Sequence, residues 1–515
     1  MYFVSKEIYS WISVGCPVRS YLIVAMVLVV AIISGVLCFA ESASVSYVIY
    51  GSIILDDGSI VCVGSRIVGR NYEGLIVRLS PEGRVLWAVS VDGPGYESFR
   101  SCIVSSKGTV WAVGYTTSFG EGSYDVFLVE ISLNGSVLKA YAVGGKDADI
   151  GQDLIETEYG LIVVGYTSSY GAGGFDLFFF KISEDGNIVW AKALGDMKYD
   201  DVGKEICRSP EGGYLIVGDT WGFGVGMDDY FLVKIDESGH VEWTKTIGGG
   251  GYDEVSSVLA LSDGFLIVGS TWSYGWGYDD VFIVRTDIKG NVLWALTIGG
   301  EEHDVAAQAL YVDGIYAVAG ATSSFGGGDY DCFIVLVKEG GAIVDGICLG
   351  SGRYETTRNF FLRNSKYLML GYSSALRKNF KDIMLAELSL DLEPSRIIFF
   401  MGGEGAPKVE FTLTKGAREV WAMWAKNVSV EARPITPFIS GCRPSVTDVT
   451  EVIGVNAFSL STVQVSSFRT GTLPKPIPWL RELKLFIRRN FAFIVLIIPC
   501  IAVVVIILWL KFRRK

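Results

Sequence analysis

Histidine is almost absent from this chain of 515 residues, since only His240 and His303 occur. A Ser-His-Asp triad or a metal site built from several histidines is therefore nearly excluded. The nine cysteines form no CxxC or Cys/His pattern with metal-binding spacing, and no GxSxG elbow occurs. The glycine-rich segments 222–226 and 248–251 lie between expected strands, whereas a phosphate-binding loop needs a helix N-terminus behind it. We interpret them as turn glycines.

Positive charge is also scarce, because 44 Lys and Arg face 56 Asp and Glu, which gives a net charge of −12. The basic residues do not cluster outside the flanks of two apolar terminal stretches. Nucleic-acid binding depends on such a cluster, so we expect no nucleic-acid partner.

What the sequence does contain is a phrase of about 51 residues that recurs along most of the chain. Its clearest copies are 212–249 and 264–300. One acidic residue precedes the most apolar run of each copy, at a spacing of 51 to 53 residues: Glu73, Asp125, Asp176, Asp229, Asp280, Asp331 and Asp382. Self-similarity at this period is typical of a fold that copies one supersecondary unit. Seven units are predicted, and an eighth is the alternative if residues 407–470 hold a decayed copy.

Each unit carries four short runs rich in β-branched and aromatic residues. In the fifth unit these runs are 256–262, 265–271, 280–286 and 291–297, and compact turns join them. Such runs predict a four-stranded antiparallel sheet. Because one sheet alone would expose apolar side chains on both faces, neighbouring sheets must stack. Radial closure predicts an all-β fold, a seven-bladed β-propeller over 41–406, whereas an open solenoid would not need a hairpin at every strand junction.

The repeated phrase resembles the WD40-like and quinoprotein-like propeller repeats of secreted and surface proteins, including uncharacterised archaeal membrane-anchored ones. The matching pieces are GYLIVGDT (213–220), DDYFLVKIDESGHVEW (228–243) and IGGGGYDE (247–254), and the resemblance covers roughly residues 46–403. It implies a propeller fold but no single activity. The Gly-His and Trp-Asp signature of WD40 blades is missing. So is the adjacent Cys-Cys pair of many quinoprotein alcohol dehydrogenases, so we predict no cofactor of that kind.

The N-terminal segment 1–40 is predicted to be a signal peptide or an uncleaved signal anchor. Its apolar run, 21–40, follows Lys6 and Arg19, and the small residues Cys38 and Ala40 favour cleavage after Ala40.

A second apolar run near the C-terminus, 491–510, has no charge over 20 residues and is long enough to span a bilayer. The basic tail 511–515 follows it, as a cytoplasmic end would require. We expect a β-rich extension with a Pro-containing spacer at 407–478, either a small domain or an addition that closes the propeller. An amphipathic juxtamembrane segment is expected at 479–490.

If the chain starts inside the cell, residues 41–490 lie outside. The sequence therefore predicts a cell-membrane protein with one C-terminal anchor, or two spans if the leader is retained, and with most of the chain extracellular.

Two acidic columns are the candidate ligand or Ca²⁺ site. We expect both columns on one face of the propeller, next to loop aromatics at Tyr170, Phe223, Tyr274 and Phe325. The candidates are Asp125, Asp176, Asp229, Asp280 and Asp331, which begin third strands, and Asp200, Asp253 and Asp304, which lie at the links between units. A residue present in every copy usually serves the fold. The preferred interpretation is therefore that each carboxylate accepts N–H bonds from its own loop.

Two covalent features are predicted on the part of the chain outside the cell. Cys332 and Cys348 are equidistant from Gly340 in a hairpin turn, so they should face each other and could form a disulfide, with two buried thiols as the alternative. Asn134 and Asn427 begin NGS and NVS sequons and are candidate glycosylation sites.

The absence of a catalytic constellation favours a binding or scaffold module for a protein, glycan or envelope partner. A surface enzyme, quinoprotein-like or carboxylate-based, is the alternative, although no acid pair stands apart from the repeat. A third hypothesis is a structural role in a surface layer, which would need self-association.

Overall fold

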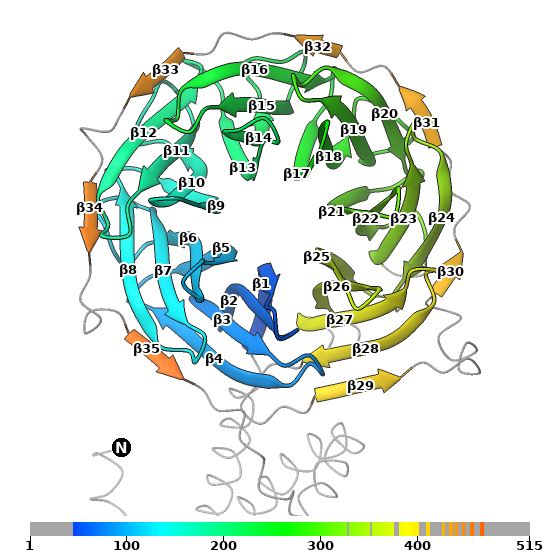
Figure 1. Ribbon diagram of the computed structural model, residues 1–515, viewed down its shortest axis with the longest axis horizontal. Coiled ribbons are helices and arrows are strands. Elements are labelled where there is room, and N and C mark those ends of the chain that lie inside the picture. Colours follow the sequence, from blue (N-terminus) through cyan, green and yellow to red (C-terminus); the bar gives the residue numbers. More distant parts are fainter. Residues whose placement is uncertain are drawn as a thin grey trace, which may run out of the picture. The chain divides into compact units, whose positions relative to one another are not determined.

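The computed structural model describes residues 45–326, 329–350, 353–374 and 381–400, and seven short strands between residues 408 and 467. These residues form seven five-stranded antiparallel sheets. In each sheet four strands come from one repeat and follow one another in space as in sequence. Figure 1 shows the sheets arranged like the blades of a propeller, with the first strand of each blade innermost. The predicted seven-bladed propeller of four-stranded repeats is confirmed.

The strands of the blades follow the repeat in chain order. Blade 1 contains β1 (Val45–Ile54), β2 (Ile60–Val68), β3 (Asn71–Leu79) and β4 (Val85–Asp92); blade 2 contains β5 (Glu97–Val104), β6 (Thr109–Thr116), β7 (Asp125–Ser132) and β8 (Val137–Gly144). Blade 3 contains β9 (Asp149–Thr157), β10 (Gly160–Thr167), β11 (Asp176–Ile182) and β12 (Ile188–Gly195); blade 4 contains β13 (Asp201–Arg208), β14 (Tyr214–Thr220), β15 (Asp229–Ile235) and β16 (Val241–Gly248). Blade 5 contains β17 (Asp253–Leu261), β18 (Gly264–Thr271), β19 (Asp280–Asp287) and β20 (Val292–Ile298). Blade 6 contains β21 (Asp304–Val312), β22 (Ile315–Thr322), β23 (Asp331–Lys338) and β24 (Ile343–Leu349); blade 7 contains β25 (Glu355–Arg363), β26 (Lys366–Ser373), β27 (Asp382–Ser389) and β28 (Pro394–Phe400).

The fifth strand of every blade comes from the C-terminal side of the repeats. These strands are β29 (Lys408–Thr412), β30 (Ala425–Asn427), β31 (Ala432–Ile435), β32 (Phe438–Ser440), β33 (Ser445–Asp448), β34 (Gly454–Ala457) and β35 (Gln464–Ser467). They pair in turn with β28, β24, β20, β16, β12, β8 and β4, so the chain returns past the blades in reverse order. We call β29–β35 the outer belt; it lies at the circumference in Figure 1.

The outer belt explains the segment for which the sequence left two interpretations open. The fourth strand of a blade would otherwise present unpaired N–H and C=O groups at the edge of its sheet. Each belt strand satisfies part of that edge, for example at the Leu194–Val446 position of blade 3. The described strands between residues 408 and 467 therefore form no eighth blade, and they add to all seven existing ones.

Apolar packing between neighbouring blades makes up the core. Between blades 3 and 4, for example, Phe179 of one sheet and Tyr214 and Phe231 of the next belong to one fully buried cluster. Burial of one such side chain contributes about 1.5–3 kcal/mol. The ring closes in the same way, because Leu75 of blade 1 shares a cluster with Leu385 of blade 7. Closure between these two blades thus uses packing, and blade 1 takes all four inner strands from its own repeat.

A tryptophan in the fourth strand locks several blades to the next. Trp243 lies against the turn of blade 5, where a Cβ atom added at Gly290 would be 2.8 Å from its ring. Trp190 and Gly239 repeat this contact at 2.9 Å. A side chain larger than hydrogen would push the indole away, so the glycine and the tryptophan are required together.

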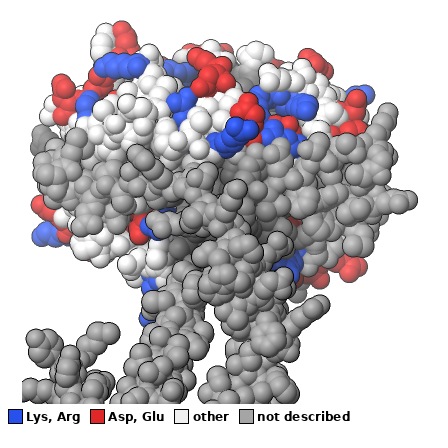
Figure 2. Space-filling model, turned by 90° about the horizontal axis from the view of Figure 1, so that it is seen from below, with Lys and Arg blue, Asp and Glu red and all other residues white. Residues whose placement is uncertain are grey.

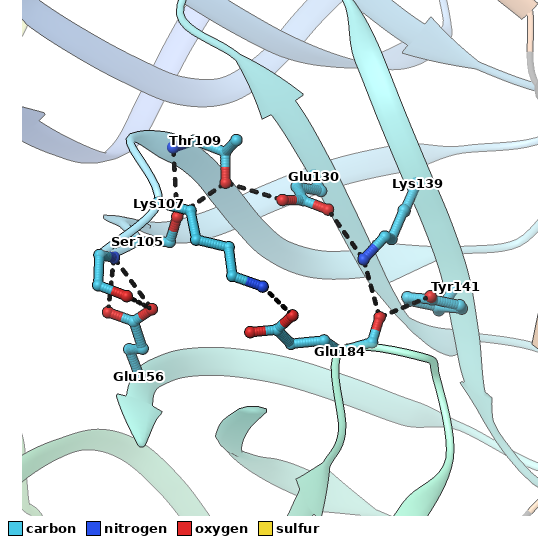
Figure 3. Close-up of polar contacts among 9 residues, drawn as sticks. Ser105, Lys107, Thr109, Glu130, Lys139, Tyr141, Glu156 and Glu184 are labelled. Atoms are coloured by element: carbon cyan, nitrogen blue, oxygen red, sulfur yellow. Dashed lines mark hydrogen bonds and ion pairs between the residues drawn. The ribbon is translucent and has the colours of Figure 1, made fainter. Parts of the chain in front are cut away.

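Polar contacts add to this lock at the same end of the blades, as Figure 3 shows for blades 2 and 3. The carboxylate of Glu156 accepts hydrogen bonds from the backbone N–H and the hydroxyl of Ser106, at 2.8–3.0 Å. Lys107 pairs with Glu184, whose carbonyl oxygen also accepts a bond from Lys139 Nζ at 2.9 Å.

The expected disulfide between Cys332 and Cys348 is wrong. Both cysteines are free, and they are offset by one residue in the β23–β24 pair, where Cys332 faces Leu349 and Cys348 faces Phe333. A register shift between Leu336 and Val337 is the cause, because it inserts one residue on one side of the hairpin. The two thiols therefore point to opposite faces of the blade and lie in different apolar clusters.

Several expectations fall outside the described residues: the leader 1–40, the juxtamembrane segment 479–490, the apolar run 491–510 and the tail 511–515. Among the described residues there is no helix of the length and hydropathy that a membrane span requires. Asn134 is exposed in the turn between β7 and β8, and Asn427 ends β30, so glycosylation at both sites stays a prediction.

Removal of the outer belt should destabilise the propeller. A chain that ends at residue 407 leaves seven fourth strands with an unpaired edge, so we expect Tm to fall by about 5 °C or more and aggregation to rise. Calorimetry and light scattering on the 41–407 and 41–475 fragments measure both effects. Equal Tm and equal solubility of the two fragments would contradict the role of the belt.

Loss of one interblade tryptophan should also lower the stability of the propeller. Trp243→Ala removes the indole from the Gly290 turn, and we expect the free energy of unfolding to fall by about 3 kcal/mol, as for other large-to-small aromatic substitutions. Trp243→Phe, which keeps a ring in the contact, should lose less. Denaturant unfolding checks this, and a change below about 0.5 kcal/mol for Trp243→Ala would count against the lock.

Candidate binding face

One face of the propeller collects both acidic columns. First and third strands of each blade run in the same direction, and an acidic residue begins nearly all of them. The loops from second to third strands and the links between blades therefore lie together, and we call this the junction face. Asp125, Asp176, Asp229, Asp280 and Asp331 begin β7, β11, β15, β19 and β23, and Asp253 and Asp304 begin β17 and β21.

In blade 4 the residue that holds this position is Asp201, and Asp200 precedes it. Asp201 begins β13 and accepts a hydrogen bond from the hydroxyl of Thr220. Asp149 and Asp253 accept the equivalent bonds from Thr167 and Thr271. Asp200 instead accepts a bond from the backbone N–H of Phe175, at 2.8 Å. In the sequence, the pair Asp201-Val202 aligns with Asp304-Val305. This alignment places Asp201, and not Asp200, in the column.

The carboxylates of both columns hold their own loops. Asp253 accepts bonds from Gly249 N–H and from the Ser273 hydroxyl, each at 2.7 Å. In the third-strand column, Asp229 accepts the N–H of Val225 at 2.6 Å and Asp280 that of Trp276 at 2.7 Å. These are the loop bonds that the structural interpretation of the columns requires.

The two columns also meet in pairs across a glycine. A Cβ atom added at Gly195 would lie 1.8 Å from Asp176 Oδ1 and 3.0 Å from Asp201 Oδ2. Gly248 stands in the same way between Asp229 and Asp253, at 1.8 and 2.6 Å. Only glycine leaves room for two carboxylates at this point.

Burial and the neighbouring carboxylate both raise the pKa of the third-strand acids. Burial raises the pKa of Asp176 to about 7, and the carboxylate of Asp201 beside it acts in the same direction. Burial also raises the pKa of Asp229 to about 7, with Asp253 as the neighbouring charge. Asp280 follows the same rule, with Asp304 beside it and a pKa of about 7.

The calcium interpretation of these columns stays a prediction. Among the described residues, no group of three or more His, Cys, Asp and Glu side chains is placed to hold a metal ion. The carboxylates come together in pairs. Asp176 and Asp280 each bind their own loop through Oδ2, whereas Oδ1 of Asp176, Asp280 and Asp304 is buried without a hydrogen-bond partner. A fall in Tm on chelation would support bound calcium, and an unchanged Tm would argue against it.

The loop aromatics expected beside the acids turn inward. Tyr170 and Tyr274 donate hydrogen bonds through their hydroxyls to the carbonyl oxygens of Gly144 and Gly248, at 2.8 and 2.6 Å. The ring of Phe223 packs on Phe231, with ring centroids 5.6 Å apart. Phe325 packs against the cluster between blades 5 and 6. All four side chains are half-buried and brace the preceding link between blades.

A different set of aromatic residues lines the junction face, and we call it the aromatic rim. It comprises Tyr199, Trp221, Tyr252, Trp272, Tyr278, His303, Tyr330, Tyr354 and Tyr372. Within each of two pairs, Tyr199–Trp221 and Tyr252–Trp272, ring centroids are 5.0 and 5.3 Å apart. From Trp272 the contacts continue ring to ring through blades 5, 6 and 7 to Tyr372, at 5.0–6.5 Å.

The rim is most exposed over blades 4 and 5. Trp221, Trp272 and Tyr278 are 40%, 49% and 54% exposed, and Trp276 in the adjoining loop is 45% exposed. Aromatic side chains of this size at the surface of a soluble domain mark candidate interaction sites.

A sequence signal for the rim exists in the residue that precedes each acid. This residue is aromatic or His at Tyr252, His303, Tyr330 and Tyr354, directly before a column acid. The column is interrupted at Asp228 and Asp279, which hides its period. Trp221 and Trp272 have a second signal, because each directly follows the threonine that ends a second strand.

Acidic groups stand among the rim aromatics of blades 4 to 6. Asp279 lies 2.6 Å from Nδ1 of His303. Burial raises the pKa of Asp228, with the carboxylate of Glu254 acting in the same direction. Lys204 lies 3.6 Å from Glu254 and also pairs with Asp219. Elsewhere, acidic and basic side chains are interspersed on the described surface, as Figure 2 shows for one side of the domain.

Comparison with known proteins identifies no family. No family model matches the chain, and no curated protein is similar to it in sequence. Solved structures that align with it include Sqt1 from Chaetomium thermophilum, with 8% identity, a TM-score of 0.36 and coverage of 64% of this chain and 95% of that one. The same protein bound to the N-terminus of the ribosomal protein L10 gives 9% identity and a TM-score of 0.38, with the same coverage. The endo-1,5-alpha-L-arabinanase of Thermotoga petrophila gives 8% identity, a TM-score of 0.25 and coverage of 69% and 96%. Likenesses this distant support no argument about function.

The carboxylate pairs predict a pH dependence of stability. The folded chain holds protons on Asp176, Asp229 and Asp280 up to a pKa of about 7, whereas the ordinary value is 3.8. The folded state therefore binds more protons than the unfolded state between these values, and Tm should fall as the pH rises from about 5 to about 8. Calorimetry over this range measures the slope.

Asn at these three positions keeps the shape but does not titrate, so the triple Asp→Asn variant should flatten the slope. Asp236→Asn is the control, because hydrogen bonds outweigh its burial and its pKa is about 2, below the window. A triple variant with an unchanged slope would contradict the assignment.

Proposed function

We propose that this chain is a binding module whose junction face docks a protein partner on the aromatic rim. The observation that carries the proposal is the exposed apolar group over blades 4 and 5. It consists of Trp221, Val225, Met227, Trp272, Trp276 and Tyr278, each at least 40% exposed.

Tryptophan and tyrosine supply the largest share of binding energy in protein interfaces, because they remove much area from water with few rotatable bonds. Val225 and Met227 add aliphatic surface beside them. The acidic side chains among the rim aromatics of blades 4 to 6 give this surface a polar margin, which suits an interface whose core is apolar.

A glycan is the second candidate, and one local arrangement favours it. Asp228 and Asp279 lie beside the rim aromatics, and carboxylates at the edge of an aromatic platform accept hydrogen bonds from sugar hydroxyls. The enzyme alternative gains no comparable support, since the paired acids belong to the repeated columns, where Asp176, Asp229 and Asp280 each bind their own loop through one oxygen.

We further propose that the module stands on the outside of the cell membrane. The uncharged run 491–510, the basic residues after it and the apolar leader support this location. A protease-protection experiment on intact cells, with detection of the propeller and of a C-terminal tag, tests this placement.

The triple variant Trp221→Ala, Trp272→Ala and Trp276→Ala should lose the partner. A screen of the 41–475 fragment against envelope proteins and glycans supplies the ligand, and we expect Kd to rise about tenfold or more, as for loss of hot-spot aromatics. Leu86→Ala with Leu293→Ala is the control, because these side chains are 53% and 54% exposed on fourth strands, away from the rim. Equal loss in both variants would contradict the proposal, and binding that survives protease treatment of the ligand would favour the glycan.

A further inference from the structure

All seven first strands carry a β-bulge at the same place. Each register shift leaves one residue without a partner in the second strand: Tyr50, Arg100, Gln152, Lys204, Ser256, Ala307 and Arg358. In blades 2 and 7 this residue is the third after the acid that begins the strand, so it lies just below the junction face. A bulge re-aims a side chain, and here it turns side chains of different blades toward each other.

The bulge residues of blades 7, 1 and 2 form one group with Lys381. The guanidinium of Arg100 lies 4.2 Å from the ring centroid of Tyr50, which belongs to the preceding blade. Arg358 is close enough to Tyr50 to interact with it electrostatically, and its Nη2 donates to the Tyr372 hydroxyl at 3.1 Å. Lys381 Nζ lies 4.2 Å from the ring centroid of Tyr372.

These three cations have no anionic partner. Neither Arg100, Arg358 nor Lys381 forms an ion pair with any carboxylate in the part of the chain that the structure describes. Nε of Arg100 is buried and has no hydrogen-bond acceptor. In a protein of net charge −12, three neighbouring cations without a carboxylate are unexpected.

Arg100 and Lys381 are half-buried and Arg358 is exposed, whereas other cations of the propeller keep a carboxylate partner. Lys204, the bulge residue of blade 4, pairs with Asp219. The largely buried Arg285 and Arg363 pair with Asp263 and Glu387. A charge taken partly out of water normally keeps a counter-ion, because its desolvation is otherwise uncompensated.

The acids nearest to the group are already engaged. Glu97, three residues before Arg100, accepts the N–H of Gly93 at 2.9 Å and the hydroxyl of Thr116. Glu355, three residues before Arg358, accepts the hydroxyl of Ser373 at 2.9 Å. Both carboxylates are fully or almost fully buried and point into the links between blades. These two carboxylates are therefore not the counter-ions of the three cations.

We propose that Arg100, Arg358 and Lys381 bind the carboxylate of a ligand that enters from the junction face. Guanidinium groups match the planar shape of a carboxylate and can donate two parallel hydrogen bonds to it. The rings of Tyr50 and Tyr372 hold the two guanidinium groups in place by cation–π contact. A singly charged ligand group fits best, since the strongly negative protein disfavours the approach of multiply charged anions.

The purely structural alternative is that the three cations only stack on tyrosines. Cation–π contact at such a partly exposed site contributes about 0.5–1 kcal/mol, and it leaves the buried Nε of Arg100 without an acceptor. A bound carboxylate supplies that acceptor. The site does not depend on the proposed function, because the exposed apolar group over blades 4 and 5 shares no residue with the three cations of blades 7 and 2.

The tyrosine between Arg358 and Lys381 provides a direct probe. Burial alone would raise the pKa of Tyr372, but the charges of Arg358 and Lys381 and the hydrogen bond from Arg358 outweigh it and lower that pKa. A bound carboxylate would neutralise this positive charge. The phenol should then titrate at higher pH.

The experiment combines thermal unfolding with tyrosine titration on the 41–475 fragment, which retains all strands of the propeller. The probes are two carboxylates, each with a neutral counterpart: galacturonate with galactose, and N-acetylglycine with N-acetylglycinamide. Inorganic phosphate is the fifth probe, and all are compared at equal ionic strength. We expect a carboxylate to raise Tm by about 2 °C or more and its neutral counterpart to leave Tm unchanged. Near-ultraviolet absorbance of the phenolate should show the earliest titration step moving to higher pH with the same carboxylate, and Tyr372→Phe should remove that step.

The double variant Arg100→Gln with Arg358→Gln should lose both effects. Arg84→Gln with Lys289→Gln is its control, since these exposed residues lie in turns on the opposite side of the blades and remove the same charge. The response to galacturonate or to N-acetylglycine would show whether a sugar acid or a peptide carboxylate is preferred. Stabilisation that persists in the double variant, a response to phosphate alone, or no response to any carboxylate would overturn the proposal.

Discussion

Face-to-face burial of apolar side chains between neighbouring blades is the interaction on which the whole structure depends. Both faces of a single blade are apolar. Residues such as Phe179 of blade 3 and Phe231 of blade 4 are buried in the cluster between the two sheets. The ring therefore has to close, and it closes by the same packing, through Leu75 and Leu385. No strand is exchanged at that seam, and the outer belt, which begins at blade 7 and ends at blade 1, adds one edge strand to each blade.

This closed ring explains how a face made of loops can be well ordered. The two acidic columns hold each loop through backbone N–H groups, and the glycine between paired acids lets adjacent blades approach closely. The inward-turned aromatics Tyr170 and Tyr274 brace the links between blades, and other aromatic residues remain at the surface as the rim. On the inner strands, the bulges direct Arg100 and Arg358 toward neighbouring blades without interrupting the sheet.

The fold could be predicted from sequence because the period, the turn residues and the strand runs all agree. What failed depended on single-residue shifts or on segments outside the repeat. One extra residue near Val337 separated Cys332 from Cys348, and the adjacent pair Asp200 and Asp201 concealed the register of blade 4. The belt strands are three to five residues long and have no period of their own, so their pairing depends on edges supplied by distant blades. The aromatic rim was missed because Asp228 and Asp279 interrupt its column.

Amide hydrogen exchange on the native chain is the most direct measurement of this account. If blades are stable only against each other, the amides of the second and third strands in all seven blades should open together, with one common free energy, and the outer belt should be protected along with the fourth strands it covers. Separate opening energies for different blades, or a belt that exchanges as fast as an unstructured peptide, would contradict the central claim.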